Sequence, residues 1–323
     1  MRLSAALIAK GNEPTLEQAI DSIRHHVDEI VLLVTGPSLS TRVGYVDRIA
    51  HSDACNAMQD CAGPCQCKAG DILDFAAARN ASFELATGDK IVWLDSDDIV
   101  VGAKKLRELA ETDAQVLSPY AYRFQGETCT EEFWLPRIVS RDKRWSAPIH
   151  EELTGLESGI KRSEAIWCHL RSEKEGHASS ERNLRIFAHH EKSPTWDQDA
   201  RFWYLYGSDL ASAQRRIHAA EVLIRAFKLT RPNTDLACIV AQSLARCLWQ
   251  QPMTMPLEWA HRALNIRPDW PSCFFLLADA YEAADRPMVA RQFAKMGCEL
   301  PREDTIWPID PSARGKWKAR LPL

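Results

Sequence analysis

Three carboxylates within four positions are the residues of this chain best suited to chemistry. Asp95, Asp97 and Asp98 directly follow the apolar run Ile91-Val92-Trp93-Leu94, which is typical of a strand buried on both faces of a parallel sheet. Acidic side chains just beyond such a strand lie at the edge where open α/β folds bind ligands. Asp95 and Asp97 alternate, so with partners they can hold a hard divalent cation, which in turn can carry nucleotide phosphates. The alternative is an acidic turn in which Asp97 or Asp98 caps a helix that begins near Gly102.

The overall composition excludes several classes of protein. A chain of 323 residues with 46% hydrophobic and 26% charged residues is typical of a soluble globular protein with room for two domains. The net charge of −4 gives no bulk attraction to nucleic acid or to an anionic membrane.

No segment reaches the ~18 apolar residues that a membrane helix needs. The start resembles a short signal peptide, but Lys10 ends its apolar run at once, so we interpret it as a buried strand. The ten cysteines then indicate a reducing, cytoplasmic location.

Strand and helix signals alternate through the first half of the chain. The apolar runs 3–9 and 30–34 predict strands, and the segment that opens at Asn12-Glu13-Pro14-Thr15 predicts a helix between them. Such a βαβ unit predicts parallel strands. We expect further strands at 43–50, 115–124, 132–139 and 165–170, and helices at 74–86 and 102–111. The fold class is therefore α/β with a mostly parallel sheet.

The pattern becomes helical after Ser172. Pro232, Pro268 and Pro301 each close a helical stretch, at spacings of 36 and 33 residues. Helix pairs repeating about every 34 residues are typical of tetratricopeptide repeats. We therefore predict that 173–323 is an all-α, tetratricopeptide-like domain with a C-terminal tail. Its expected role is packing and contact with a protein partner or a second copy of the chain.

Five short motifs lie in the first half of the chain: Lys10-Gly11-Asn12-Glu13, Asp28-Glu29-Ile30-Val31, Asp74-Phe75 with Arg79-Asn80, Trp93-Leu94-Asp95-Ser96-Asp97-Asp98, and Ile149-His150-Glu151. In this order and spacing they resemble the family-two glycosyltransferases of the GT-A (Rossmann-like) fold. The resemblance covers 3 to about 170 and defines a GT-A domain over 1–172. A subgroup of that family carries tetratricopeptide-like helices behind its catalytic domain.

The resemblance implies transfer of a sugar from a nucleotide-sugar donor, usually with inversion and with the help of Mn²⁺ or Mg²⁺. The metal would neutralise the charge that develops on the departing diphosphate. The family's metal-binding aspartate matches Asp97, and Asp95 would contact the ribose or the water shell of the metal. A histidine beyond the final strand often completes the metal shell in this fold, and His169 has that position. The alternative is that His169 is a buried structural residue.

The resemblance also assigns a catalytic base. Inverting transfer needs a carboxylate that takes the proton of the acceptor. Glu151 and Glu152 are the candidates, and only one of two adjacent residues in an extended segment can face the donor. Glu151 stands next to His150 as in the family motif, so we assign the base to Glu151 in preference to Glu152. The alternative is that Glu151 holds a loop through backbone N–H groups.

Two further residues are expected near the nucleotide. Glu13 would lie beside the donor, or would complement the dipole of the following helix. Arg79, with Asn80, would contact a phosphate, or would fix its helix against neighbouring loops. The family usually ends its second strand with an aspartate that recognises the base, and this chain has Val34 there. Recognition of uracil by that residue is therefore in doubt, and the donor base stays open.

Four cysteines, Cys55, Cys61, Cys65 and Cys67, fall within thirteen residues. Four thiolates suffice for a tetrahedral structural zinc site, although this spacing departs from paired Cys-x-x-Cys knuckles. Free thiols or disulfides in the loop are the alternatives.

Two other functions compete with glycosyl transfer. A nucleotidyltransferase would also use paired carboxylates and a metal. A non-catalytic scaffold would bind partners through its helical repeats and carry a degenerate sheet domain, as the missing strand-end aspartate suggests. The sequence does not specify the acceptor, which could be a protein, a glycan, a nucleic acid or a small molecule.

Overall fold

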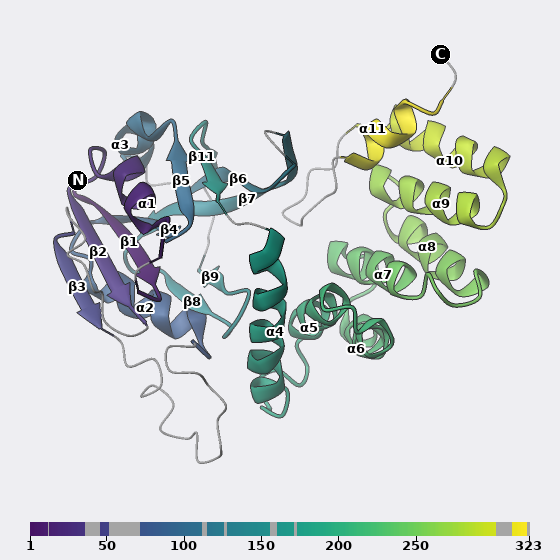
Figure 1. Ribbon diagram of the computed structural model, residues 1–323, viewed down its shortest axis with the longest axis horizontal. Coiled ribbons are helices and arrows are strands. Elements are labelled where there is room, and N and C mark those ends of the chain that lie inside the picture. Colours follow the sequence, from purple (N-terminus) through teal and green to yellow (C-terminus); the bar gives the residue numbers. More distant parts are fainter. Residues whose placement is uncertain are drawn as a thin grey trace. The chain divides into compact units, whose positions relative to one another are not determined.

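The computed structural model describes residues 1–11, 13–35, 46–51, 72–111, 115–125, 128–155, 160–170, 173–301 and 312–321. The chain divides into two compact units, 1–172 and 173–323, each of which is described by itself (Figure 1). None of the helices in the described ranges is both long enough and apolar enough to cross a membrane.

The first unit is built on a sheet whose first part is parallel. Strand β1 (Leu3–Ala9) lies between β2 (Glu29–Val34) and β4 (Lys90–Asp95), and β3 (Arg48–His51) lies beside β2. All of these neighbours run parallel. The strands β1, β2 and β4 are almost wholly apolar and buried, as expected where helices cover both faces of a sheet, whereas Arg48 and Ile49 of β3 are exposed.

The rest of the sheet is mixed. Beside β4 lies β7 (Thr128–Ser140), which is antiparallel to β4 and to β6 (Gln115–Gln125). Beyond β6, the strands β10 (Ile160–Arg162) and β11 (Ile166–His169) are parallel to it, and β5 (Asp98–Val101) is antiparallel to β11.

The prediction of an α/β sheet is therefore confirmed, and the sheet is mixed, because β7 and β5 run antiparallel to their neighbours. Two residues separate the end of β6 at Gln125 from the start of β7 at Thr128. So short a connection forces the two strands to run antiparallel, because a parallel pair needs a crossover of a dozen residues or more.

Helices cover both faces of the sheet. Alternate residues of β1 point to opposite faces, so Leu3, Ala5 and Leu7 pack with α1 (Leu16–Ile23) and α3 (Leu106–Ala110), which follows the 3₁₀ turn η2 (Ala103–Lys105). Ala6 packs on the other face with α2 (Phe75–Leu85). A separate hairpin of β8 (Arg144–Ser146) and β9 (Glu152–Thr154) contacts α2. This arrangement places α2 and the hairpin beside the carboxyl ends of β1 and β4.

The second unit is helical throughout its described residues. It begins with α4 (Glu173–His190) and continues with three helix pairs and a shorter helix. These are α5 (Ala200–Ser212) with α6 (Arg216–Leu229), α7 (Asp235–Cys247) with α8 (Thr254–Ile266), α9 (Pro271–Ala283) with α10 (Pro287–Glu299), and α11 (Ser312–Lys318). Pro232, Pro268 and Pro301 follow the second helix of each pair. The prediction of a tetratricopeptide-like region is confirmed.

Small residues let the helices of a pair approach closely. A Cβ atom added to Gly207 on α5 would lie 2.6 Å from Cγ of Leu223 on α6. In contrast, a Cβ added to Gly315 on α11 would have no atom within 4 Å.

We expect the Gly207→Ala variant to have a free energy of unfolding about 1–3 kcal/mol lower than that of the Gly315→Ala variant. Both changes raise helix propensity by ~1 kcal/mol, but only the first overpacks a helix contact. Urea unfolding of the two variants beside the wild type measures the difference. Equal effects at both positions would contradict the close packing of α5 on α6.

Candidate functional site

The acidic motif forms a tight turn between two strands. Asp95 is the last residue of β4, Asp98 is the first residue of β5, and Ser96 and Asp97 lie between them. The backbone N–H of Leu170, just beyond β11, donates to the carbonyl oxygen of Asp97 at 2.7 Å. Neither Asp97 nor Asp98 caps a helix, because the chain continues as β5 and the turn η2 begins after Gly102 without a side-chain cap. The capping alternative is therefore wrong.

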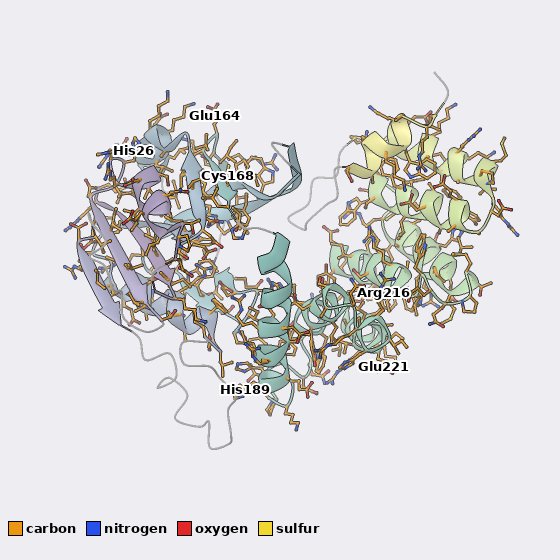
Figure 2. The ribbon with its side chains drawn as sticks, viewed as in Figure 1. His26, Glu164, Cys168, His189, Arg216 and Glu221 are labelled. Atoms are coloured by element: carbon orange, nitrogen blue, oxygen red, sulfur yellow. The ribbon has the colours of Figure 1, made fainter. Side chains whose placement is uncertain are left out.

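Strand pairing brings a histidine to this turn. His169 is the last residue of β11 and lies opposite Asp98 in the antiparallel register of β5 and β11. Figure 2 labels Cys168, the preceding residue of the same strand. Its Nδ1 atom lies 3.1 Å from Oδ1 of Asp98 and 3.4 Å from Oδ1 of Asp97. Within the described ranges, Asp97, Asp98 and His169 form a group whose potential ligand atoms all lie within 4.8 Å of one another.

Asp98 is the buried anchor of that group. Its side chain has no exposed surface, and its Oδ2 lies 3.2 Å from Nη1 of Arg137, which is equally buried. Its Oδ2 also accepts the backbone N–H of Asp95, and its Oδ1 accepts the hydroxyl of Tyr120 at 3.2 Å. The Arg137 guanidinium lies 3.8 Å from the ring centroid of Trp93. Hydrogen bonds replace water around the Asp98 carboxylate, whereas Nε and Nη2 of Arg137 have no hydrogen-bond partner among the described residues and the guanidinium is covered by the rings of Trp93 and Tyr120.

The carboxylates control the protonation of their neighbours. Burial alone would lower the pKa of His169, but its hydrogen bond with Asp98 and the charges of Asp97 and Asp98 raise that pKa above its ordinary value. Burial raises the pKa of Tyr120 well above its usual range, and Asp98 raises it further. Tyr120 therefore stays a neutral phenol that donates a hydrogen bond within the group.

Arg79 on α2 joins two of the predicted site carboxylates. Its Nη2 donates to Oδ1 of Asp95 at 2.7 Å, and its Nε donates to Oε1 of Glu151. The guanidinium lies against the rings of Trp93 and Trp145, with centroid distances of 4.7 Å and 5.1 Å. Burial alone would raise the pKa of Asp95, but the charge of Arg79 holds it below its ordinary value. This geometry supports the fixing role expected for Arg79; contact with a phosphate stays a prediction.

Asn80, the next residue on α2, fixes the hairpin that carries Glu151. Its side-chain amide donates to the carbonyl of Trp145 at 3.0 Å, and its amide oxygen accepts the N–H of Trp145 at 2.8 Å. The backbone N–H of Phe75, at the start of the same helix, donates to the carbonyl of Pro148 at 2.8 Å. The Arg79-Asn80 pair therefore ties the hairpin to the end of β4.

The hairpin loop distinguishes Glu151 from Glu152. Ser146 and Glu152 are paired across β8 and β9, so 147–151 form the loop. Glu152 is exposed, whereas the side chain of Glu151 is 10% exposed and contacts Arg79. Ala147 and His150 adopt positive φ angles of 69° and 48°. Such backbone conformations cost energy in residues other than glycine and gather at functional sites.

Glu13 reaches the same turn from the loop after β1. It is half-buried and forms a hydrogen bond with the hydroxyl of Ser96. Burial raises its pKa above the ordinary value for a glutamate. At the end of β2, in contrast, Val34 is buried and the Thr35 hydroxyl donates to the carbonyl of Ala9 at 3.2 Å. The described end of β2 therefore supplies no carboxylate for a nucleotide base.

Sequence reasoning missed the residues that hold the carboxylates in place. Asp98 was expected only as part of an acidic motif or as a cap, and Tyr120 and Arg137 were not singled out. Arg137 had a usable signal, because it is the one charged residue in the otherwise apolar run 133–139 of the predicted strand, and such a charge requires a partner when buried. Cys55, Cys61, Cys65 and Cys67 lie outside the described residues, so zinc binding stays a prediction.

The residues at the turn fit a hard divalent cation. The Asp97 side chain is 32% exposed and the Asp95 side chain 27% exposed, so each can reach an ion from solvent. The His169 nitrogen that faces Asp97 is Nδ1, which also hydrogen-bonds with Asp98, so a metal bound between Asp97 and Nδ1 would take the place of the His169–Asp98 hydrogen bond. The oxygens of Asp98 already contact Arg137, Tyr120 and His169, so Asp98 is better suited to positioning than to ligation. Asp95 lies outside the close group, and its ligation stays a prediction.

Comparison with known proteins identifies the second unit more clearly than the first. No family model matches the sequence. A TPR repeat-containing protein of Synechococcus elongatus is 26% identical over an alignment of 179 residues that covers 51% of this chain and 39% of that protein. The chain thus spans about two fifths of the length of this curated relative.

Solved structures also match this chain in part. YrrB, described as a TPR protein with an unusual peptide-binding site, matches with a TM-score of 0.36 and 13% identity, covering 44% of this chain and 67% of that one. A crystal structure of MamA matches with a TM-score of 0.35 and 12% identity, covering 40% of this chain and 72% of that one. The C-terminal unit is tetratricopeptide-like, and the family of the N-terminal α/β unit is not identified by these matches.

Proposed function

We propose that the first unit is a metal-dependent inverting glycosyltransferase of the GT-A, family-two type that uses a nucleotide-sugar donor. The observation that carries the proposal is the convergence of Asp97, His169, Asp95 and Glu151 at the carboxyl end of β4. A diphosphate leaving group needs positive charge beside it and the acceptor needs a base, and this edge of the sheet offers residues for both tasks.

Each residue near the turn has a distinct proposed role. Asp97 and His169 hold Mn²⁺ or Mg²⁺, and the buried Asp98–Arg137 pair fixes the start of β5 behind them. When bound, the metal neutralises charge on the diphosphate oxygens. Asp95 contacts the ribose or the water shell of the metal, and its bond to Arg79 fixes its orientation. Glu13, whose raised pKa reflects its burial, lies beside Ser96 and contacts the nucleotide.

Glu151 is the proposed catalytic base. Arg79 forms ion pairs with both Glu151 and Asp95, so it holds Glu151 near the carboxyl end of β4, where we propose that the donor binds. Asn80 fixes the loop that carries Glu151. A carboxylate in this position accepts the proton of the acceptor hydroxyl as its oxygen attacks the anomeric carbon. Glu152 on β9 is exposed and belongs to the surface of the hairpin.

We expect Glu151→Gln to lower turnover by a factor of ~10² or more while donor binding stays near normal, because the amide keeps the shape and loses the basicity. Initial-rate kinetics with a fixed donor measure this effect, and Glu152→Gln is the matched control. Unchanged turnover in Glu151→Gln with a large loss in Glu152→Gln would move the role one residue along. If both variants keep turnover, the base lies elsewhere.

A non-catalytic scaffold is the second candidate. It is favoured by Val34 at the end of β2, where the family-two glycosyltransferases usually have an aspartate. In either case the helical unit is proposed to bind a protein partner or a second copy of the chain, the usual role of stacked helical repeats. A nucleotide-sugar screen with and without Mn²⁺ separates the two candidates, since a scaffold gains no metal-dependent donor binding.

A further inference from the structure

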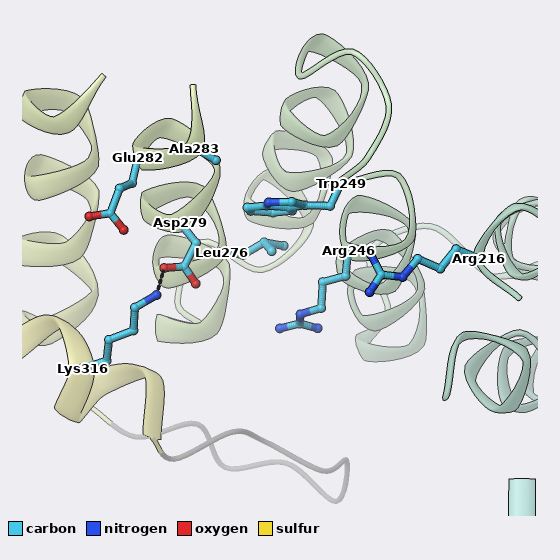
Figure 3. A pocket seen from close by; sticks show the side chains of 8 residues that line it. All are labelled: Arg216, Arg246, Trp249, Leu276, Asp279, Glu282, Ala283 and Lys316. Atoms are coloured by element: carbon cyan, nitrogen blue, oxygen red, sulfur yellow. Dashed lines mark hydrogen bonds and ion pairs between the residues drawn. The ribbon is translucent and has the colours of Figure 1, made fainter. Parts of the chain in front are cut away.

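The helical unit contains a pocket of about 570 Å³, within the size range of sites that bind ligands. Its lining comes from α6, α7, α9 and α11 and from the turn after α7 (Figure 3). Trp249 and Leu276 give it an apolar part. We call it the Trp249 pocket; its lining residues are Arg216, Arg246, Trp249, Leu276, Asp279, Glu282, Ala283 and Lys316.

The charges in the Trp249 pocket are unevenly compensated. On one side, Asp279 pairs with Lys316 at 2.6 Å and Glu282 pairs with Arg320 at 2.9 Å. On the other side, Arg216 and Arg246 form no ion pair with a carboxylate among the described residues. Figure 3 shows Trp249 and Leu276 between the two sides.

Both arginines affect the pKa of the same buried thiol, that of Cys247. Burial raises the pKa of the Cys247 thiol, and Arg216 and Arg246 are the two cations that oppose this rise. Arg246 is exposed and Arg216 is half-buried, so solvent or a ligand can reach both guanidinium groups. The pocket thus combines two uncompensated cations with an aromatic and an aliphatic side chain.

We propose that the Trp249 pocket binds a segment of a partner protein that presents a carboxylate beside an apolar side chain. Guanidinium groups bind carboxylates through paired, charge-assisted hydrogen bonds. Trp249 and Leu276 supply an apolar surface for the neighbouring side chain, and tryptophan and arginine are the residues that most often dominate the energy of protein interfaces. This proposal is independent of sugar transfer by the first unit.

The opposite wall argues against a nucleic acid in the same pocket. Asp279 and Glu282 also line it, and a run of phosphates would meet these carboxylates as well as the two arginines. The net charge of the whole chain is −4, which adds no general attraction for a polyanion. A single carboxylate can contact the arginine side alone, whereas an extended polyphosphate cannot.

A selection from a phage-displayed library of random peptides, with the full-length chain as bait, tests the proposal. We expect the enriched peptides to carry Asp or Glu beside an aromatic or aliphatic residue. One enriched peptide is then synthesised with a fluorophore, and its affinity is measured by fluorescence anisotropy. We expect Arg246→Gln and Arg216→Gln each to weaken binding about tenfold or more, because a charge-assisted hydrogen bond is lost. Arg291→Gln, an exposed change on α10 outside the pocket, is the matched control and should leave the affinity unchanged.

A change in the peptide itself repeats the test on the wild-type chain. Replacing the acidic residue of the enriched peptide by its amide should weaken binding by the same factor as the arginine variants, whatever their folding. Failure of the selection to enrich any peptide, enrichment of peptides without an acidic residue, or equal affinity for the acid and amide peptides would each overturn the proposal. Displacement of the peptide by a single-stranded oligonucleotide, with the same dependence on Arg246, would reassign the pocket to nucleic acid.

Discussion

Arg137→Met is expected to lower the free energy of unfolding by about 3–5 kcal/mol, the range found when one partner of a buried ion pair is removed. The change leaves the Asp98 carboxylate, which has no exposed surface, without its guanidinium partner 3.2 Å away. Methionine occupies a similar volume, so the loss of the charge dominates over the loss of packing. Thermal or urea unfolding of the purified variant measures the effect without any knowledge of the donor or acceptor.

A surface ion pair provides the matched control for Arg137. Arg107 pairs with Asp28 at 2.9 Å, but its side chain is 47% exposed, so Arg107→Met should change stability little. The double variant Arg137→Met with Asp98→Asn should recover part of the lost stability, because no buried charge then lacks a partner. Equal effects of Arg137→Met and Arg107→Met would contradict the anchoring role of the Asp98–Arg137 pair.

Asp97→Ala is expected to abolish sugar transfer and the stabilisation of the protein by Mn²⁺, while the fold is retained. The side chain is 32% exposed in a turn, so its removal opens no core cavity. A metal at 100 times its dissociation constant should stabilise the wild type by ~2.7 kcal/mol, and this gain should disappear in the variant. Differential scanning fluorimetry with and without Mn²⁺ measures it.

Asp142→Ala removes an exposed carboxylate at the turn after β7 and is the matched control for Asp97. It should keep both transfer and the response to Mn²⁺. Retained activity of Asp97→Ala, or of the wild type in excess chelator, would remove the metal from the mechanism.

The sequence predicted the elements that have strong local signals. The apolar runs at β1, β2 and β4 specify buried strands, and the prolines after α6, α8 and α10 mark the ends of helix pairs, because proline cannot continue a helix. Local patterns could not specify the mixed sheet, since the direction of β7 and β11 depends on pairing between residues far apart in the chain.

In the candidate site, too, local sequence patterns predicted some residues and could not predict others. Asp95 and Asp97 were recognisable from their spacing after an apolar strand, and Glu151 from its motif. The β5 strand was missed because 98–101 is short and was expected to lead into a helix. The register that places His169 opposite Asp98 depends on β5, so it was missed as well. The burial of Arg137 and the Arg79 link between Asp95 and Glu151 depend on side chains that only the folded sheet and hairpin bring together.

Donor binding is the most direct test of the central claim, which is that Asp97 and its neighbours hold a nucleotide sugar through a metal. The measurement is the melting temperature of the full-length chain in a panel of nucleotide sugars, each with and without Mn²⁺, for the wild type, Asp97→Ala and Asp142→Ala. We predict that at least one nucleotide sugar raises the melting temperature of the wild type and of Asp142→Ala only when Mn²⁺ is present, and leaves Asp97→Ala unchanged. Stabilisation by no member of the panel, or stabilisation that persists without metal and in Asp97→Ala, would contradict the account.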